Sequence, residues 1–92
     1  MQIISNIAKL RTILNKARRR GKNIGFVPTM GALHEGHGSL LRQARKNNSL
    51  VVLSIFVNPK QFGKSEDFTK YPREENKDCL FAKKENVDII FY

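Results

Sequence analysis

Residues 25–37 read Gly25-Phe26-Val27-Pro28-Thr29-Met30-Gly31-Ala32-Leu33-His34-Glu35-Gly36-His37. The apolar residues at the beginning of this stretch predict the end of a buried strand, and the glycines after them predict a turn. Two histidines three residues apart stand where a helix is expected to begin. A helix start presents unpaired backbone N–H groups and a partial positive charge, and an imidazole there adds a hydrogen-bond donor. The stretch therefore predicts a site for the phosphates of a nucleotide.

Apolar spacing predicts the elements that precede the loop. Side chains recur at helical intervals over residues 6–20, which predicts a helix behind a short edge strand at Ile3 and Ile4. Residues 23–28 predict a fully buried parallel strand. Pro28 is expected to end that strand, because proline cannot donate to a strand ladder.

The loop itself is expected to cover residues 29–36 and to lead into a second helix from His37 to Asn47. Gly31 and Gly36 permit backbone shapes and close ligand approach that a Cβ atom would block. This part of the chain therefore places both histidines at the junction of a loop and a helix.

The second half of the chain repeats the alternation. Residues 50–57 are apolar nearly throughout and predict a strand covered on both faces, and a long polar loop follows over residues 58–72. A third helix is expected from Pro72 to Glu85, with Leu80 and Phe81 facing inward.

A last strand is expected over residues 87–92. The alternation of helices and strands predicts an α/β fold with a parallel sheet and right-handed crossovers. Ligands in such sheets bind beyond the carboxyl ends of the strands. Both informative loops leave carboxyl ends, so we expect them to flank one crevice.

Bulk composition limits the class of protein. The chain has 92 residues, 40% of them hydrophobic, and a formal net charge of +9. No apolar run approaches the roughly 20 residues that span a bilayer. The first residues lack the layout of a signal peptide, and Cys79 has no second cysteine for an internal disulfide. We expect one small domain, located in the cytoplasm and without a membrane partner.

The positive charge is densest in residues 18–22, which include Arg18, Arg19, Arg20 and Lys22. One interpretation is a basic module that binds nucleic acid or another polyanion. The other is a solvated basic helix end, where cations also suit the helix dipole. The second is favoured because no stacking-aromatic motif or zinc-finger spacing accompanies the charge, so no nucleic-acid partner is expected.

Two local patterns imitate known motifs without meeting their requirements. The histidines of residues 34–37 lie three apart, whereas zinc proteases place them four apart on a formed helix. Gly63-Lys64-Ser65 is similar to the end of a Walker A loop, but Asn58 stands where that loop needs its first glycine. We therefore expect no metal site formed by the chain's own side chains.

Three blocks, in matching order and spacing, resemble the pantothenate synthetase (pantoate–β-alanine ligase) family. They are residues 28–37, residues 54–62 and the segment from Glu66-Asp67 to Tyr71-Pro72-Arg73. The His-x-Gly-His core alone is less specific, because other nucleotidyl transferases share it. The resemblance implies a half-Rossmann, three-layer fold of parallel strands and crossover helices, and an ATP-dependent ligase that forms an amide bond.

The resemblance also implies a reaction in two steps. Pantoate attacks the α-phosphate of ATP to give pantoyl adenylate and pyrophosphate. β-Alanine then attacks the activated carbonyl, which releases AMP and pantothenate. Attack at a phosphate builds negative charge on its oxygens, and preorganised donors stabilise that charge. ATP is thus the expected substrate, and Mg²⁺ is expected with it.

Residue roles follow from the same resemblance. His34 and His37 are implied to contact phosphate as catalytic residues, with His37 as the proton donor. Without the resemblance, His34 is equally a solvent-facing loop residue and His37 a helix-capping one. The implied ATP-binding segment comprises Met30, Gly31, Ala32, Leu33, His34, Glu35, Gly36 and His37. The implied pocket for pantoate and β-alanine comprises Gln61, Asn58, Phe62 and Tyr71, of which Tyr71 is equally a packing aromatic.

The sequence departs from the family pattern in two ways. Gly38 stands where a larger apolar residue usually follows the second histidine, and it is expected to loosen His37. Family members are also about three times as long, so residues 1–92 are expected to be the N-terminal portion of the ATP- and pantoate-binding domain, without the C-terminal domain. The intact enzyme is expected to be a homodimer. The alternatives are an inactive nucleotide-binding fragment and a basic polyanion-binding module.

Overall fold

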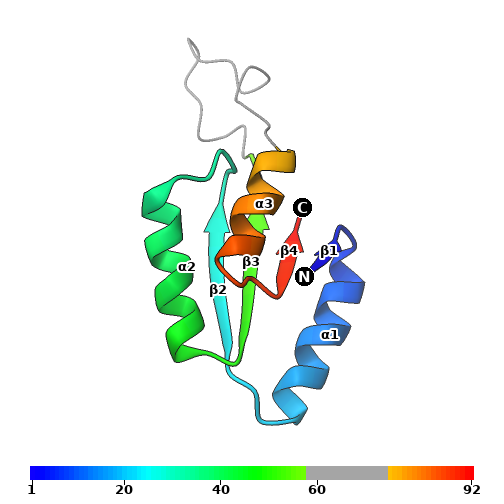
Figure 1. The fold of residues 1–92 in the computed structure, drawn as a ribbon. Helices are drawn as coiled ribbons and strands as arrows, with labels where there is room; N and C mark the ends of the chain where they lie inside the picture. Colours follow the sequence, from blue (N-terminus) through cyan, green and yellow to red (C-terminus); the bar gives the residue numbers. More distant parts are fainter. Residues whose placement is uncertain (58–74) are drawn as a thin grey trace, which may run out of the picture.

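The computed structural model of the chain describes residues 1–57 and 75–92, and its strands form one parallel sheet (Figure 1). The sheet order is β1-β4-β3-β2, and every neighbouring pair is parallel. This confirms the α/β fold with crossover helices. In chain order the elements are β1 (Gln2–Ile4), α1 (Ile7–Arg19), β2 (Ile24–Thr29), α2 (Glu35–Asn47), β3 (Leu50–Ile55), α3 (Glu75–Lys84) and β4 (Ile89–Phe91).

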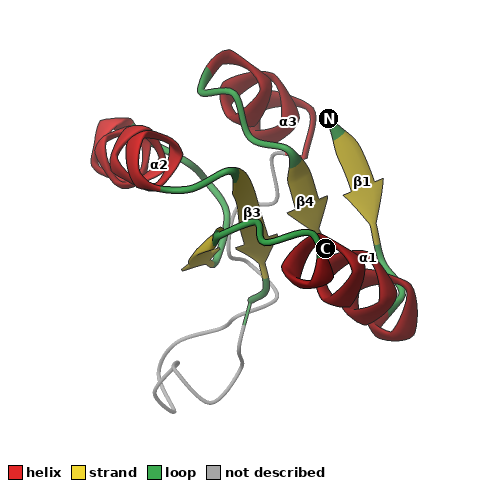
Figure 2. Ribbon diagram, turned by 90° about the horizontal axis from the view of Figure 1, so that it is seen from below, coloured by secondary structure: helices red, strands yellow, loops and turns green. Residues whose placement is uncertain are grey.

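The helices lie on two sides of the sheet, which gives three layers (Figure 2). Helices α2 and α3 cover one face, and α1 covers the other. Alternate side chains of each strand point to opposite faces, so each side of the sheet has its own apolar cluster. Under α2 and α3 the buried cluster comprises Val27, Leu41, Val51, Leu53, Ile55, Ala82, Val87 and Ile90. Under α1 it comprises Ile4, Leu10, Val52 and Ile89.

Strand β3 is the centre of the core, as its continuous apolar sequence predicts. Val51, Val52 and Leu53 are 0% exposed, and burial of each such side chain contributes about 1.5–3 kcal/mol. The strand ends at Ile55, earlier than expected, and Phe56 beyond it is 66% exposed. The central strand therefore brings its carboxyl end to the same edge of the sheet as β2.

Strand β2 is an edge strand and only half-buried, so the expectation of a fully buried strand was wrong. Phe26 is 56% exposed because α1 covers the β1 side of the sheet and leaves that face of β2 open. Pro28 does not end the strand but lies inside it, opposite Ser54. The Asn23 carbonyl accepts a hydrogen bond from β3, and the Thr29 carbonyl accepts one from the residue after β3. The backbone N–H and C=O groups of odd-numbered residues in β2 therefore point toward β3. The nitrogen of the even-numbered Pro28 points toward the open edge of the sheet.

The expected orientation of Leu80 needs correction. Leu80 is 70% exposed rather than inward, because the buried side of α3 is formed by Asp78 and Ala82. Phe81, in contrast, does pack against the core. The described part of this helix begins at Glu75, so the expected start at Pro72 lies outside it. Within the described ranges, no helix is long and apolar enough to cross a membrane.

Candidate functional site

The loop between β2 and α2 lies at the same end of the sheet as the start of α3 (Figure 1). Two hydrogen bonds fix its beginning: the Thr29 hydroxyl donates to the Ser54 carbonyl at 2.9 Å, and Gly31 N–H donates to the Thr29 hydroxyl at 3.2 Å. Gly31 has a φ of +88°, and a Cβ there would lie 3.1 Å from Ile55 Cγ2. Both facts explain why a glycine occupies this position.

Asp78 fixes the middle of the loop from α3. Its carboxylate is buried, with the residue 3% exposed, and it accepts from two successive backbone N–H groups. Ala32 N–H donates to Oδ2 at 3.1 Å and Leu33 N–H donates to Oδ1 at 2.9 Å. The sequence interpretation missed this residue, although an aspartate one helical turn before the buried Ala82 was a visible signal.

The two histidines cap α2 reciprocally. His34 is the N-cap, and its Nδ1 accepts from Gly36 N–H at 3.0 Å. His37 lies in the first turn, and its Nδ1 accepts from His34 N–H at 3.1 Å. The ring centroids are 4.2 Å apart. A Cβ at Gly36 would lie 2.8 Å from His34 Cε1, so this glycine makes room for the capping ring. Helix α2 therefore begins at Glu35, earlier than the expected His37.

This capping fixes the tautomer of both rings. A nitrogen that accepts a hydrogen bond carries no proton, so a neutral ring with Nδ1 as acceptor holds its proton on Nε2. Across residues 1–57 and 75–92, neither Nε2 has a hydrogen-bond partner. Each ring therefore offers one N–H donor at the start of a helix, where anions bind favourably.

Burial lowers the pKa of His37, and the neighbouring His34 lowers it further, while Asp78 acts in the opposite direction. The partial positive charge of the helix start also disfavours a cationic ring at this position. Near neutral pH His37 is consequently a neutral hydrogen-bond donor rather than a cation.

The space beside Gly38 is filled by neighbouring side chains. It is buried in α2, and a Cβ there would lie 3.0 Å from Phe81 Cζ and 3.2 Å from Arg42 Nη1. The ring from α3 thus fills the volume that a larger residue at position 38 would need. The expectation that Gly38 loosens His37 gains no support, because the first turn keeps both capping bonds.

The predicted ATP-binding segment is therefore one contiguous loop and helix start. Charged side chains flank this segment at the start of α2, where Glu35 forms an ion pair with Arg42. Arg42 Nη1 also lies 3.0 Å from Glu85 Oε2. The four predicted substrate residues, Asn58, Gln61, Phe62 and Tyr71, lie outside the described residues, and so does the crevice expected between the two loops. In the part of the chain that is described, no group of three or more His, Cys, Asp or Glu side chains could hold a metal ion.

Comparison with known proteins decides the family. The sequence model of pantoate-beta-alanine ligase matches residues 2–92. The chain belongs to this family. It is 54% identical over 92 residues to pantothenate synthetase from Bacillus cereus (strain AH187), and 53% identical over 92 residues to that from Sulfurihydrogenibium sp. (strain YO3AOP1). Each match spans all of this chain but only about a third (33%) of the ligase concerned.

Solved structures of ligases in this family have the same fold. Pantothenate synthetase from Thermus thermophilus matches with a TM-score of 0.87 at 44% identity, covering 99% of this chain and 31% of that one. The pantoate-beta-alanine ligase from Francisella tularensis matches with a TM-score of 0.89 at 43% identity, covering 99% of this chain and 34% of that one. The Francisella structure is a complex with beta-gamma ATP and β-alanine.

Proposed function

We propose that residues 1–92 form the N-terminal, ATP- and pantoate-binding part of a pantothenate synthetase. The observation that carries the proposal is the pair of imidazoles at the start of α2, both with Nδ1 engaged and with no acceptor for Nε2–H among the described residues. A related ligase in complex with beta-gamma ATP and β-alanine supports the same chemistry. The activity belongs to a protein about three times this length.

The proposed reaction joins pantoate to β-alanine through an adenylate. A carboxylate oxygen of pantoate attacks the α-phosphorus of ATP, and the bond to pyrophosphate breaks. The amine of β-alanine then attacks the acyl carbon, loses a proton, and AMP departs. In the first step negative charge grows on the phosphate oxygens, and His34 and His37 donate to them through Nε2–H. Donors that are already held in place need no reorganisation when that charge develops.

The remaining partners of the site complete the proposal. Gln61 hydrogen-bonds pantoate, and Asn58, Phe62 and Tyr71 shape the pocket where β-alanine enters. Mg²⁺ arrives bound to the phosphates of ATP, which is its usual way of binding in nucleotide sites. We further propose a cytoplasmic homodimer as the working enzyme.

A graft tests the role of His37. Residues 1–92 replace the matching third of the Bacillus cereus enzyme, and pantothenate formation is assayed. His37→Ala is expected to reduce the rate by ~10²–10³, the usual cost of losing one such donor. His37→Gln, which places an amide N–H near Nε2, is expected to retain more activity than His37→Asn, which keeps only an acceptor near Nδ1. A fully active His37→Ala graft contradicts the proposal.

The chain alone offers a test that needs no graft. Addition of MgATP is expected to shift the ¹⁵Nε2 resonances of both histidines while their Nδ1 atoms stay unprotonated. We also propose that the isolated chain binds ATP without turnover, since it covers only 33% of its relatives. Release of AMP from ATP and pantoate by residues 1–92 would overturn that second statement.

A further inference from the structure

Asp78 is a buried carboxylate whose partners within the described ranges are backbone N–H groups. It is 3% exposed, and among the described residues its partners are two backbone N–H groups and no Lys or Arg side chain. Its place in the first turn of α3 adds the partial positive charge of a helix start. Burial of a charged group is costly unless hydrogen bonds compensate it, and here the two backbone N–H groups do so.

The contact lies at the most constrained point of the loop. Ala32 has a φ of +51° and follows Gly31 at +88°, so two successive residues adopt left-handed backbone. For an alanine this conformation costs roughly 1–2 kcal/mol. The two hydrogen bonds from Ala32 and Leu33 to the carboxylate offset that cost and fix the direction in which the chain enters α2.

The same contact removes two donors from the phosphate site. With their N–H groups directed at Asp78, Ala32 and Leu33 cannot direct them at a ligand on the opposite side of the loop. The Nε2–H groups of His34 and His37 are among the donors that remain at the start of α2, together with backbone N–H of its first turn. A phosphate there meets the imidazoles, while the carboxylate that would repel it stays buried behind the backbone.

From this geometry we infer that Asp78 is a positioning residue of the nucleotide site: its carboxylate holds the loop so that the two capped imidazoles face the phosphates. The inference rests on the proposed function for the identity of the ligand. The purely structural alternative is that Asp78 only ties α3 to the sheet.

The contact itself is measurable in the unmodified chain. In protein labelled with ¹³C and ¹⁵N, couplings across the hydrogen bonds are expected between the Asp78 carboxyl carbon and the amide nitrogens of Ala32 and Leu33. Absence of both couplings, with the corresponding coupling from Val51 to Asp88 present, would overturn the inference. This arm needs no substitution and therefore does not depend on whether a variant folds.

The positioning role is tested with a matched pair of variants, Asp78→Asn and Asp88→Asn. Each replaces a carboxylate that accepts from backbone N–H, but Asp88 bonds Val51, far from the loop in sequence. Under conditions where both variants are folded, Asp78→Asn is expected to weaken ATP binding by ~10- to 100-fold, as misplaced groups generally do. It is also expected to disturb the ¹⁵Nδ1 resonances of both histidines, whereas Asp88→Asn leaves both measurements unchanged.

The outcomes separate the two proposals. A folded Asp78→Asn chain with unchanged histidine resonances, or with unchanged ATP affinity, overturns the positioning role. If the unmodified chain binds no ATP, the proposed function fails for the chain, while the histidine resonances of the two variants still decide whether Asp78 positions the imidazoles. Equal effects of Asp78→Asn and Asp88→Asn would assign Asp78 a purely structural role and also overturn the inference.

Discussion

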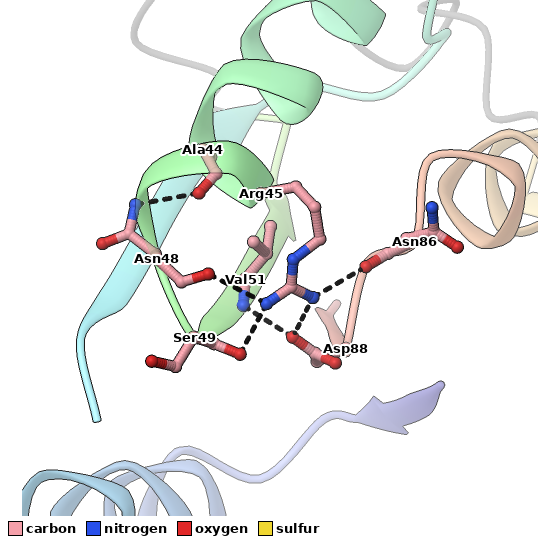
Figure 3. Close-up of polar contacts among 7 residues, drawn as sticks. All are labelled: Ala44, Arg45, Asn48, Ser49, Val51, Asn86 and Asp88. Atoms are coloured by element: carbon pink, nitrogen blue, oxygen red, sulfur yellow. Dashed lines mark hydrogen bonds and ion pairs between the residues drawn. The ribbon is translucent and has the colours of Figure 1, made fainter. Parts of the chain in front are cut away.

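Two aspartates hold opposite ends of the sheet in different ways. At the carboxyl end, Asp78 is almost fully buried and bonds backbone N–H groups. At the amino end, Asp88 accepts from Arg45 Nη1 at 2.7 Å and from Val51 N–H at 2.8 Å (Figure 3). The side chains of Arg45 and Asp88 are 29% and 36% exposed. The first contact shapes a loop, and the second joins elements.

The Arg45 cluster shows what a joining contact requires. Its guanidinium also donates to the carbonyls of Asn48, Ser49 and Asn86, so one side chain from α2 connects the turns before β3 and β4 (Figure 3). The Arg45 guanidinium thus has several acceptors, and the ion pair that it forms with Asp88 is partly exposed to solvent. Among residues 1–57 and 75–92, Asp78 accepts from two backbone N–H groups and from no other donor, so the two ends are expected to respond differently to the same substitution.

The largest effect is expected for Asp78→Ala. It leaves the N–H groups of Ala32 and Leu33 without their acceptor, at about 1–3 kcal/mol for each unsatisfied donor. The free energy of unfolding, measured with urea, should fall by about 2–4 kcal/mol. A loss below about 1 kcal/mol would mean that water replaces the carboxylate and that the two ends do not differ.

A smaller effect is expected for Asp88→Ala. Arg45 keeps three carbonyl partners and a partly exposed ion pair contributes little, but Val51 N–H loses its acceptor, so the loss should be about 1–2 kcal/mol. Salt screens exposed charges, so in ~1 M NaCl the loss for Asp88→Ala should shrink. The loss for Asp78→Ala should stay unchanged there, and parallel salt dependence of both would contradict the contrast.

The carboxyl end alone is expected to respond to mild acid. The pKa of His37 is lowered in the fold from 6.5, so the unfolded chain takes up a proton more readily than the folded one. Stability from this group is complete above pH 6.5 and is lost as the pH falls from there through the lowered value. Protonation of Nδ1 also breaks the bond from His34 N–H, and loss of a cap costs about 1 kcal/mol.

Urea unfolding at about pH 7.5 and at about pH 5.5, on either side of the ordinary histidine pKa, measures this response. His37→Asn supplies the control, because its amide oxygen can accept from His34 N–H and does not titrate in this range. The variant should lose less stability on acidification than the unmodified chain. The same pH dependence in both would show that the cap does not depend on the protonation of His37.

The smallest effect is expected for Gly38→Ala. Alanine favours a helix over glycine by up to about 1 kcal/mol, but its Cβ would press on Phe81 Cζ at 3.0 Å. The net change should stay within about 0.5 kcal/mol of zero. In a Phe81→Leu background the same substitution should stabilise the chain relative to Phe81→Leu alone. Thermal unfolding of the unmodified chain, both single variants and the double variant measures this coupling, and additive effects would contradict it.

Patterns visible over a few residues predicted much of this fold. The continuous apolar run of β3 and the helical spacing before Gly21 each have one physical solution, and both elements were confirmed. The two histidines at a helix start were likewise readable, because glycine turns and helix starts have local signatures. What the sequence could not show is which neighbours each element has in space.

The misses share that cause. Pro28 was predicted to end a strand, because a proline inside a strand is tolerated only where the strand lies at the edge of a sheet. Whether β2 is an edge strand depends on the order of the strands, which the neighbours of Pro28 in sequence do not show. Leu80 was placed inward because an apolar residue is the default choice for a buried helix face. Asp78 is buried there instead, because it accepts hydrogen bonds from loop residues that lie 45 and 46 positions away in sequence. Such long-range polar contacts leave no periodicity in the sequence.

The outward-facing nitrogen of Pro28 has a consequence for whatever pairs with β2. A strand that pairs with this edge of the sheet would meet the N–H group of Phe26 but no N–H group at Pro28, so regular pairing stops there. Prolines at such borders discourage indiscriminate addition of foreign strands. A strand that pairs with β2 must therefore be short or be interrupted opposite Pro28, because a long regular ladder cannot continue past that residue.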